Sequence, residues 1–250
     1  MTLLSIVNYS QLGSTNDEAR RLAQGGAASG TLVRADSQTA GRGRHGRAWQ
    51  SPPGNFFGSL ILRTGQPLHS VATVALVAGI AVYDAVAVLT PPAVAESLTL
   101  KWPNDLLVQG SKLAGILVES LLSESGRLEA ILIGIGVNLA SAPAIVDYPT
   151  SSLAQLIGTA PAAGDFATGL GQGLLHWLGR WEGAGFAPLA PEWNLRAAAM
   201  IGCEVTSRAA NSAPVTGRFL GVNPQGALLL QTHSGITAHH SGEWRFQSTL

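Results

Sequence analysis

The sequence predicts an α+β protein built on an antiparallel or mixed sheet. Strand-like segments follow one another with short loops between them, as at 112–122 and 128–137. A long apolar helix, predicted at about 70–89, separates the strand-like segments 55–62 and 98–102. A doubly wound sheet needs a helix between each pair of successive parallel strands, so this order of elements favours the α+β class.

The N-terminal part alternates helix, strand and a long polar loop. A short helix is predicted where the polar run 14–17 supplies N-cap candidates, and a pair of glycines ends it. The strand-like run 31–35 leads into segment 36–53, which contains glycine, arginine, polar residues and proline with almost nothing to bury. Farther along, an apolar stripe predicts a helix at 165–181.

From about residue 196 the chain changes to short β segments separated by turns. Strands are predicted at 204–207, 216–220, 227–231 and 243–246. These segments predict a small barrel of about fifty residues, which is at the lower limit for independent folding. We therefore predict two domains, 1–195 and 196–250.

Composition limits the possible functions. Of the 250 residues, 46% are hydrophobic, which excludes a disordered or fibrous chain. The 15 basic and 15 acidic side chains give a net charge of zero, which argues against broad electrostatic binding to nucleic acid or an anionic membrane. Cys203 is the single cysteine, so the chain forms no internal disulfide, and a zinc site built from cysteines is not expected.

The N-terminal sequence lacks the features of a targeting segment, because it has no basic region, long apolar run and cleavage site in succession. The longest apolar stretch, 71–82, is too short to span a bilayer and is expected to be a core helix. We expect a cytoplasmic protein that does not contact a membrane.

The segment from Gly41 to Arg47 reads Gly-Arg-Gly-Arg-His-Gly-Arg. It contains G-x-G-x-x-G, but no helix follows and no acidic residue lies between Asp36 and Asp84, so the dinucleotide-binding interpretation fails. Glycines let backbone N–H groups approach an anion, and guanidinium groups match phosphate or carboxylate oxygens. Basic residues are sparse elsewhere in the chain. The three arginines gathered in this segment therefore favour an anion-binding loop over a basic loop that is merely solvated. We expect the empty loop to be mobile, with unpaired arginines.

The only two lysines, Lys101 and Lys112, lie in a second group of motifs. Lys101 opens Lys-Trp-Pro-Asn-Asp, which ends at Asp105, and Lys112 opens Lys-Leu-Ala-Gly-Ile. A lysine at the mouth of a pocket can neutralise developing negative charge, whereas the alternative is a surface lysine beside a turn. Thirteen of the fifteen cationic side chains are arginine, so two retained lysines around one motif weaken that alternative.

Other signals are weaker by themselves. Segment 134–138, Gly-Ile-Gly-Val-Asn, ends an apolar strand, and a strand-terminating turn explains it better than a ligand site does. By themselves, residues 14–16 are also explained better as a helix cap than as a ligand site. The six histidines are scattered, which argues against histidine catalysis and a zinc site.

Taken in order, these motifs resemble those of biotin protein ligases. The shared blocks are 14–16, 35–49, 101–105, 112–119 and 134–138. The resemblance continues more faintly to the C-terminus and implies a class II synthetase-like catalytic domain followed by an SH3-like barrel. Some bacterial members carry an N-terminal DNA-binding domain; Ser14 lies near the start here, so we expect the monofunctional form. His45 stands where many relatives have another basic residue.

The resemblance implies a two-step reaction. Biotin and ATP form biotinyl-5′-AMP and pyrophosphate, and a lysine of a biotin carboxyl carrier domain then accepts the biotinyl group. ATP and Mg²⁺ are implied, with no tightly bound prosthetic group, no nucleic-acid partner, and a monomer or homodimer. Two alternatives stay open: a lipoate–protein ligase with the same chemistry, and a non-catalytic protein that senses biotin or its adenylate.

The resemblance also implies roles for individual residues. Lys112, Arg44 and Asp105 are the expected catalytic residues, and Asp105 is a possible metal ligand. The residues expected to bind biotin are Ser14, Thr15, Asn16, Gln38, Gly41, Arg42, Gly43, Arg44, Lys112 and Gly115. Those expected to bind ATP or the adenylate are Arg42, Arg44, Arg47, Trp49, Lys101, Asn104, Lys112 and Asn138. Trp49 is expected to pack on the adenine, the valeryl chain of biotin to lie along 113–115, and loop 39–49 to close over the adenylate.

Overall fold

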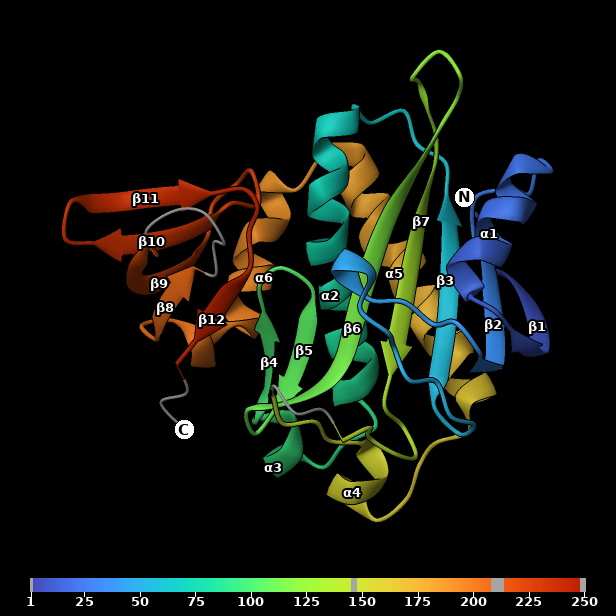
Figure 1. Cartoon of the computed structure of the whole chain (residues 1–250), viewed down its shortest axis with the longest axis horizontal. Helices are drawn as coiled ribbons and strands as arrows, with labels where there is room; N and C mark the ends of the chain where they lie inside the picture. Colours follow the sequence, from blue (N-terminus) through green and yellow to red (C-terminus); the bar gives the residue numbers. More distant parts are fainter. Residues whose placement is uncertain (1, 145–147, 208–213, 248–250) are drawn as a thin grey trace.

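The protein is built on two sheets, which the computed structural model describes over residues 2–144, 148–207 and 214–247 (Figure 1). The larger sheet has seven strands in the order β1-β2-β3-β7-β6-β5-β4. Its strands are β1 (Ser5–Leu12), β2 (Thr31–Gln38), β3 (Phe56–Leu62), β4 (Leu98–Lys101), β5 (Asp105–Val108), β6 (Ser111–Leu122) and β7 (Leu128–Val137). Only the β1–β2 pair is parallel within this sheet, so the predicted α+β class with a mixed sheet is confirmed.

Helices cover both faces of the larger sheet (Figure 1). The α-helices are α1 (Thr15–Gln24), α2 (Val74–Ala87), α3 (Pro92–Ala95), α4 (Leu153–Ile157), α5 (Ala163–Ala184) and α6 (Ala190–Arg196). Short 3₁₀ turns lie at Arg44–Gly46, Leu68–Thr73, Ala187–Leu189 and Ala198–Met200. Side chains alternate along β7, so Ala130 and Leu132 face α1 while Ile131 and Ile133 face α2 and α5.

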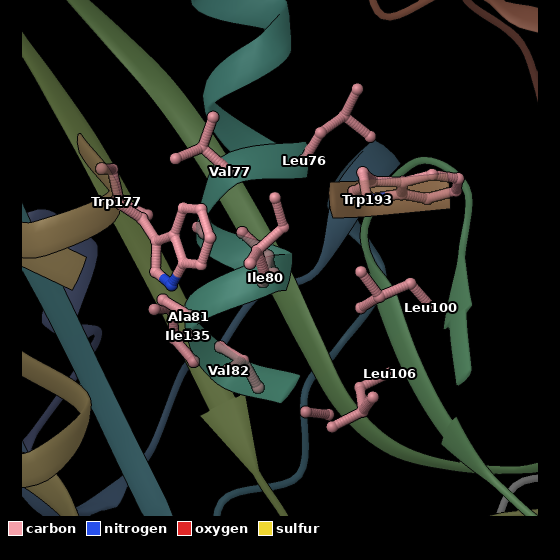
Figure 2. Close-up of a cluster of buried hydrophobic side chains, with 14 of the residues drawn as sticks. Leu76, Val77, Ile80, Ala81, Val82, Leu100, Leu106, Ile135, Trp177 and Trp193 are labelled. Atoms are coloured by element: carbon pink, nitrogen blue, oxygen red, sulfur yellow. The ribbon is translucent and has the colours of Figure 1, made fainter. Parts of the chain in front are cut away.

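Helix α2 lies at the centre of the main core and is apolar on nearly all sides, as expected for a helix buried on every face. Figure 2 shows its side chains Val77 and Ile80 among residues from the sheet and from α5 and α6, including Leu100, Trp177 and Trp193. Each of these side chains is less than 10% exposed. This packing fixes the position of the strands that carry the pocket described below.

Within the described residues, one helical stretch, Leu68–Ala87, is long and apolar enough to cross a membrane by length and composition alone. It is longer than the apolar run 71–82 because the 3₁₀ turn Leu68–Thr73 continues directly into α2. In its most apolar window, 61% is buried inside the protein. Burial in the core therefore accounts for its composition.

The smaller sheet has five antiparallel strands in the order β11-β10-β9-β8-β12. They are β8 (Glu204–Ser207), β9 (Thr216–Val222), β10 (Leu228–Thr232), β11 (Gly235–His239) and β12 (Trp244–Phe246). The sheet is consistent with the expected SH3-like barrel. Phe219 and Leu228 belong to the same buried cluster as α2, and Trp102 Nε1 donates to the carbonyl of Gly226 at 3.1 Å. The two sheets thus share one core, and the division at residue 195 stays a prediction.

Candidate functional site

A cavity of about 1330 Å³ opens between the first turn of α1, the arginine-rich loop, strands β5, β6 and β7, and the smaller sheet. Its lining includes nearly every residue that the sequence predicted for the site. These are Ser14, Thr15, Asn16, Gln38, Arg42, Gly43, Arg44, Arg47, Trp49, Lys101, Asn104, Asp105, Lys112, Gly115 and Asn138. Gly41 is absent from this lining: it packs against Trp49 and Ser51, and a Cβ there would lie 2.6 Å from the carbonyl oxygen of Trp49.

Glycines form the floor of the cavity. Gly115 on β6 and Gly136 on β7 are partners in the strand register, and Gly134 lies two residues earlier on the same strand. A Cβ on Gly136 would lie 2.5 Å from the Trp49 ring, and a Cβ on Gly115 would lie 2.9 Å from it. The glycines therefore let the indole lie directly on the sheet. The interpretation of 134–138 as only a strand-terminating turn is wrong, because β7 continues to Val137 and its glycines line the cavity.

Lys112 and Asp105 form an ion pair in the wall of the cavity. Lys112 Nζ lies 2.7 Å from Asp105 Oδ1, and the two side chains are only 12% and 18% exposed. The ammonium also lies 5.3 Å from the Trp49 ring centre and 5.4 Å from that of Tyr148. The alternative of a surface lysine is therefore wrong. Tyr148 was missed by the sequence analysis, since nothing near it in the sequence marks it as a ligand-site residue.

Arg44 enters the cavity from the loop opposite. Its Nη1 donates to Asn104 Oδ1 at 3.1 Å, and Asn104 Nδ2 donates to the carbonyl of Ile116 at 3.0 Å. Asn104 thereby ties the arginine to strand β6. Burial lowers the pKa of Arg44, and the charge of Asp105 counters this shift; the guanidinium keeps its positive charge at neutral pH. Arg44 and Lys112 therefore both place a positive charge near the Asp105 carboxylate in the cavity wall.

The other two arginines of the loop differ from their prediction. They were expected to be unpaired, but Arg42 makes two hydrogen bonds to the Asp17 carboxylate, at 2.7 and 2.6 Å. Arg47 Nη2 lies 2.6 Å from Glu243 Oε1, directly before β12 of the smaller sheet, and His45 Nε2 lies 3.5 Å from the same oxygen. The loop is anchored at both sides because acids distant in sequence reach it. Among the described residues, no group of three or more His, Cys, Asp or Glu side chains forms a metal site.

The first turn of α1 closes the far end of the cavity. Ser14 is the N-cap residue by position, yet its side chain makes no capping hydrogen bond. The Thr15 amide donates to Gln38 Oε1 at 2.7 Å, and Gln38 Nε2 donates to Ser51 Oγ at 2.9 Å. Gln38 thus fixes the turn with both ends of its amide. A role limited to helix capping does not account for residues 14–16, which are buried and line the cavity.

Two predicted residues lie at the edges of the cavity. Asn138 is 2% exposed, and its Nδ2 donates to the carbonyl of Ser151 at 3.1 Å, so it also holds the chain that follows β7. Lys101 lies on the side facing the smaller sheet, with Nζ 5.7 Å from the ring centre of Phe246. Segment 113–115 was predicted to lie along the valeryl chain of biotin, but only part of it reaches the cavity. Gly115 lines the cavity, while Leu113 is buried in the core.

Known proteins are similar to this one in both sequence and architecture. Residues 9–138 match the model of the biotin/lipoate A/B protein ligase family. A biotin–[acetyl-CoA-carboxylase] ligase of Paracoccus denitrificans is 40% identical over 89% of this chain and 92% of its own length. A ligase of the same description from Mycobacterium tuberculosis is 36% identical over 93% of this chain and 85% of its own length.

The structural comparison agrees. The structure of a biotin protein ligase from Aquifex aeolicus in complex with biotin and ATP matches with a TM-score of 0.82 at 26% identity, covering 98% of this chain and 99% of that one. Fold and cavity together define the class of protein: a biotin protein ligase-like catalytic sheet joined to a small C-terminal sheet. The chain belongs to the biotin/lipoate A/B protein ligase family.

Proposed function

We propose that this protein activates biotin with ATP and transfers it to a biotin carboxyl carrier protein. In the first step an oxygen of the biotin carboxylate attacks the α-phosphorus of ATP; the bond to the β-phosphate oxygen breaks and pyrophosphate leaves. In the second step the amine of a carrier lysine attacks the acyl carbon of biotinyl-5′-AMP. The acyl–phosphate bond breaks, AMP leaves, and the amine loses a proton as the amide forms.

The observation that carries this proposal is the pair of cations, Arg44 and Lys112, at one end of a cavity whose other end is formed by neutral polar groups. A carboxylate and a phosphate repel each other, so their approach needs fixed positive charge. The buried ion pair with Asp105 holds the Lys112 ammonium in the cavity wall. At the far end, Thr15 and Asn16 suit a neutral polar ring.

Trp49 separates these two ends. Its indole lies on Gly115 and Gly136, next to the Lys112 ammonium, so it forms a flat apolar wall between the polar and the charged parts of the cavity. This position suits the apolar chain that links the ring of biotin to its carboxylate. Packing of Trp49 on the adenine, and closure of loop 39–49 over the adenylate, stay predictions.

A divalent metal ion fits this site only when phosphate oxygens of the nucleotide help to bind it. Two carboxylates, Asp105 and Glu243, line the cavity within the described residues, and each already contacts a cation. Mg²⁺ commonly binds phosphate oxygens with one or two carboxylates. Asp105 is the residue that would hold it, and the ion would supply charge neutralisation at the phosphates.

Partners and location follow from the same proposal. We infer that biotin, ATP and a carrier domain are the substrates, that the protein acts in the cytoplasm, and that it is a monomer or homodimer. The net charge of zero supports the expectation that neither nucleic acid nor a membrane is a partner.

The exchange of labelled pyrophosphate into ATP tests the first step directly. We expect exchange that depends on biotin, with none when lipoate replaces it. Exchange with lipoate alone would select the lipoate ligase alternative. Tight binding of biotin without exchange would select the non-catalytic sensor.

A further inference from the structure

A second, smaller pocket borders the cavity described above. Its volume is about 370 Å³, and it is lined by the 3₁₀ turn before α2, the first residues of α2, the middle of β6 and two turns of the smaller sheet, at 225–226 and 240–241. Arg44 and Asn104 line both this pocket and the larger cavity. Their hydrogen bond of 3.1 Å therefore lies in the wall that the two spaces share. We call the smaller space the second pocket.

The walls of the second pocket are mostly apolar. Val71, Leu76 and Ile116 line it, and each of these side chains is less than 10% exposed. Among the described residues of its lining there is no Asp or Glu, and the histidines His69 and His240 lie at exposed positions. Walls of this kind suit an alkyl chain, whereas a highly charged anion such as pyrophosphate would lose its hydration there with few donors in return.

The second step of the proposed reaction needs an entrance of its own. The carrier amine must reach the acyl carbon while biotinyl-5′-AMP still occupies the larger cavity. That carbon is expected between Arg44 and Lys112, where the carboxylate meets the α-phosphate. The second pocket reaches Arg44, but neither Lys112 nor Trp49 lines it. It therefore approaches the reacting carbon from a side that the bound adenylate leaves open.

The chemistry of these walls suits a lysine that has to react. A lysine attacks as the neutral amine, because the ammonium form has no lone pair to donate. Burial among apolar side chains disfavours the ammonium form, and the positive charge of Arg44 disfavours it further, so both lower the pKa of an entering lysine. No carboxylate among the described lining residues opposes this effect.

We propose that the second pocket admits the acceptor lysine of the carrier domain, whose amine attacks the adenylate beside Arg44. The inference rests on the proposed function and adds the path of the second substrate. The amine nitrogen forms a bond to the acyl carbon, and the acyl–phosphate bond breaks. Its electron pair leaves with AMP, and the proton that the nitrogen releases passes to water.

The test fills the second pocket and measures the two steps separately. Ala72 is an exposed residue of the 3₁₀ turn and lines this pocket but not the larger cavity, so Ala72→Trp places an indole in the proposed path. We expect kcat for transfer to a carrier domain to fall at least about tenfold, with KM for the carrier changed less than about threefold. Biotin-dependent pyrophosphate exchange should stay within about twofold of the native rate, because the first step does not use this path.

Two further variants and a small nucleophile complete the test. Gln225→Trp introduces the same bulk from an exposed position across the pocket, on the smaller sheet, and should reproduce the pattern. Val88→Trp is the matched control, since Val88 caps the other end of α2, is 82% exposed and lines neither space. It should transfer biotin at the native rate. Hydroxylamine is small enough to reach the acyl carbon without the second pocket, so all variants should form biotinyl hydroxamate at the native rate.

Three results would overturn the proposal. Unchanged transfer in both Ala72→Trp and Gln225→Trp would show that the lysine enters elsewhere. A higher KM for the carrier at native kcat would show that the carrier only rests on this surface. An equal fall in exchange and in transfer would assign the second pocket to the activation of biotin.

Failure of this proposal is distinguishable from failure of the proposed function. Native exchange together with unimpaired transfer in the two pocket variants would contradict the proposal alone. Absence of exchange by the native protein would contradict the proposed function. Transfer from chemically prepared biotinyl-5′-AMP to the carrier then still compares the native protein with Ala72→Trp, and the same tenfold difference in kcat, about that predicted above, would support the path.

Discussion

Lys112 Nζ lies 2.7 Å from Asp105 Oδ1, and both side chains are largely withdrawn from solvent in the wall of the cavity. Lys112 is the second residue of β6 and Asp105 begins the neighbouring strand β5, so the sheet itself holds the two groups in place. The contact with the carboxylate holds the ammonium in the cavity wall. A ligand carboxylate or phosphate that enters therefore meets a cation that is already positioned.

Removing the ammonium should affect activity far more than folding. For Lys112→Ala we expect biotin-dependent pyrophosphate exchange to fall by about 10²–10³ in kcat, because one fixed positive charge is lost where negative charge develops. Asp105 would then be left without its cation, so Lys112→Ala combined with Asp105→Asn is the control for stability. Exchange within threefold of the native rate would contradict the role of Lys112.

The glycine floor should tolerate no side chain under Trp49. We expect Gly136→Ala to weaken biotin binding by at least about tenfold, because a Cβ 2.5 Å from the indole forces the ring off the sheet. Gly169→Ala on the exposed face of α5 is the matched control, since no atom lies within 4 Å of the added methyl group. It should stabilise the fold by about 0.5–1 kcal/mol and leave binding unchanged. Calorimetry and thermal unfolding measure the two effects.

The ion pair between Arg42 and Asp17, which holds the arginine-rich loop against α1, should be lost in acid. The hydrogen bonds from Arg42 hold the pKa of Asp17 below its usual value of 3.8. A depressed pKa means that the stabilisation is fully present above pH 3.8 and is lost as the pH falls further and the carboxylate is protonated. Because the pair is half-exposed, we expect a contribution of at most about 1 kcal/mol.

The measurement for this anchor is the difference in melting temperature between the native protein and Asp17→Asn as a function of pH. The difference should be constant at neutral pH and disappear below pH 3.8. A difference that grows in acid would show that Asp17 is not the group whose charge binds the loop.

The ion pair between Arg47 and Glu243, which joins the loop to the smaller sheet, should influence nucleotide binding. Glu243→Gln weakens the contact to Arg47, so the loop loses a fixed point at the mouth of the cavity. We expect KM for ATP to rise several-fold, with kcat changed by less than about twofold. Glu124→Gln, an exposed carboxylate in the turn between β6 and β7, is the control. If the two variants had equal kinetic constants, the contact between the loop and the smaller sheet would make no contribution to ATP binding.

The sequence predicted those elements whose patterns are local. The long helix α2, the β6–β7 hairpin and four of the five strands of the smaller sheet were expected close to their observed bounds. Strand β1 was not predicted, because it lies at the edge of the sheet and its side chains show no regular alternation of apolar residues. Strand β5 was missed because its four residues directly follow the turn at Pro103 and Asn104.

For the site, motif spacing located most of the residues that line the cavity, but it could not reveal their partners. Arg47 and Glu243 are 196 residues apart, and only the folded chain brings them together. The same holds for Glu119 and Asn16, which are separated by 103 residues. The loop was therefore predicted as a set of unpaired arginines, although the acids that bind two of them were already present in the sequence.

Biotinylation of a purified carrier domain tests the central claim most directly. The native protein, with biotin, ATP and Mg²⁺, should add one biotinyl group to the carrier, measured as a mass increase, and Lys112→Ala should do so at about 10²–10³ lower rate. The reaction should stop when either biotin or ATP is omitted. An unmodified carrier, or equal rates for the native protein and Lys112→Ala, would contradict the account.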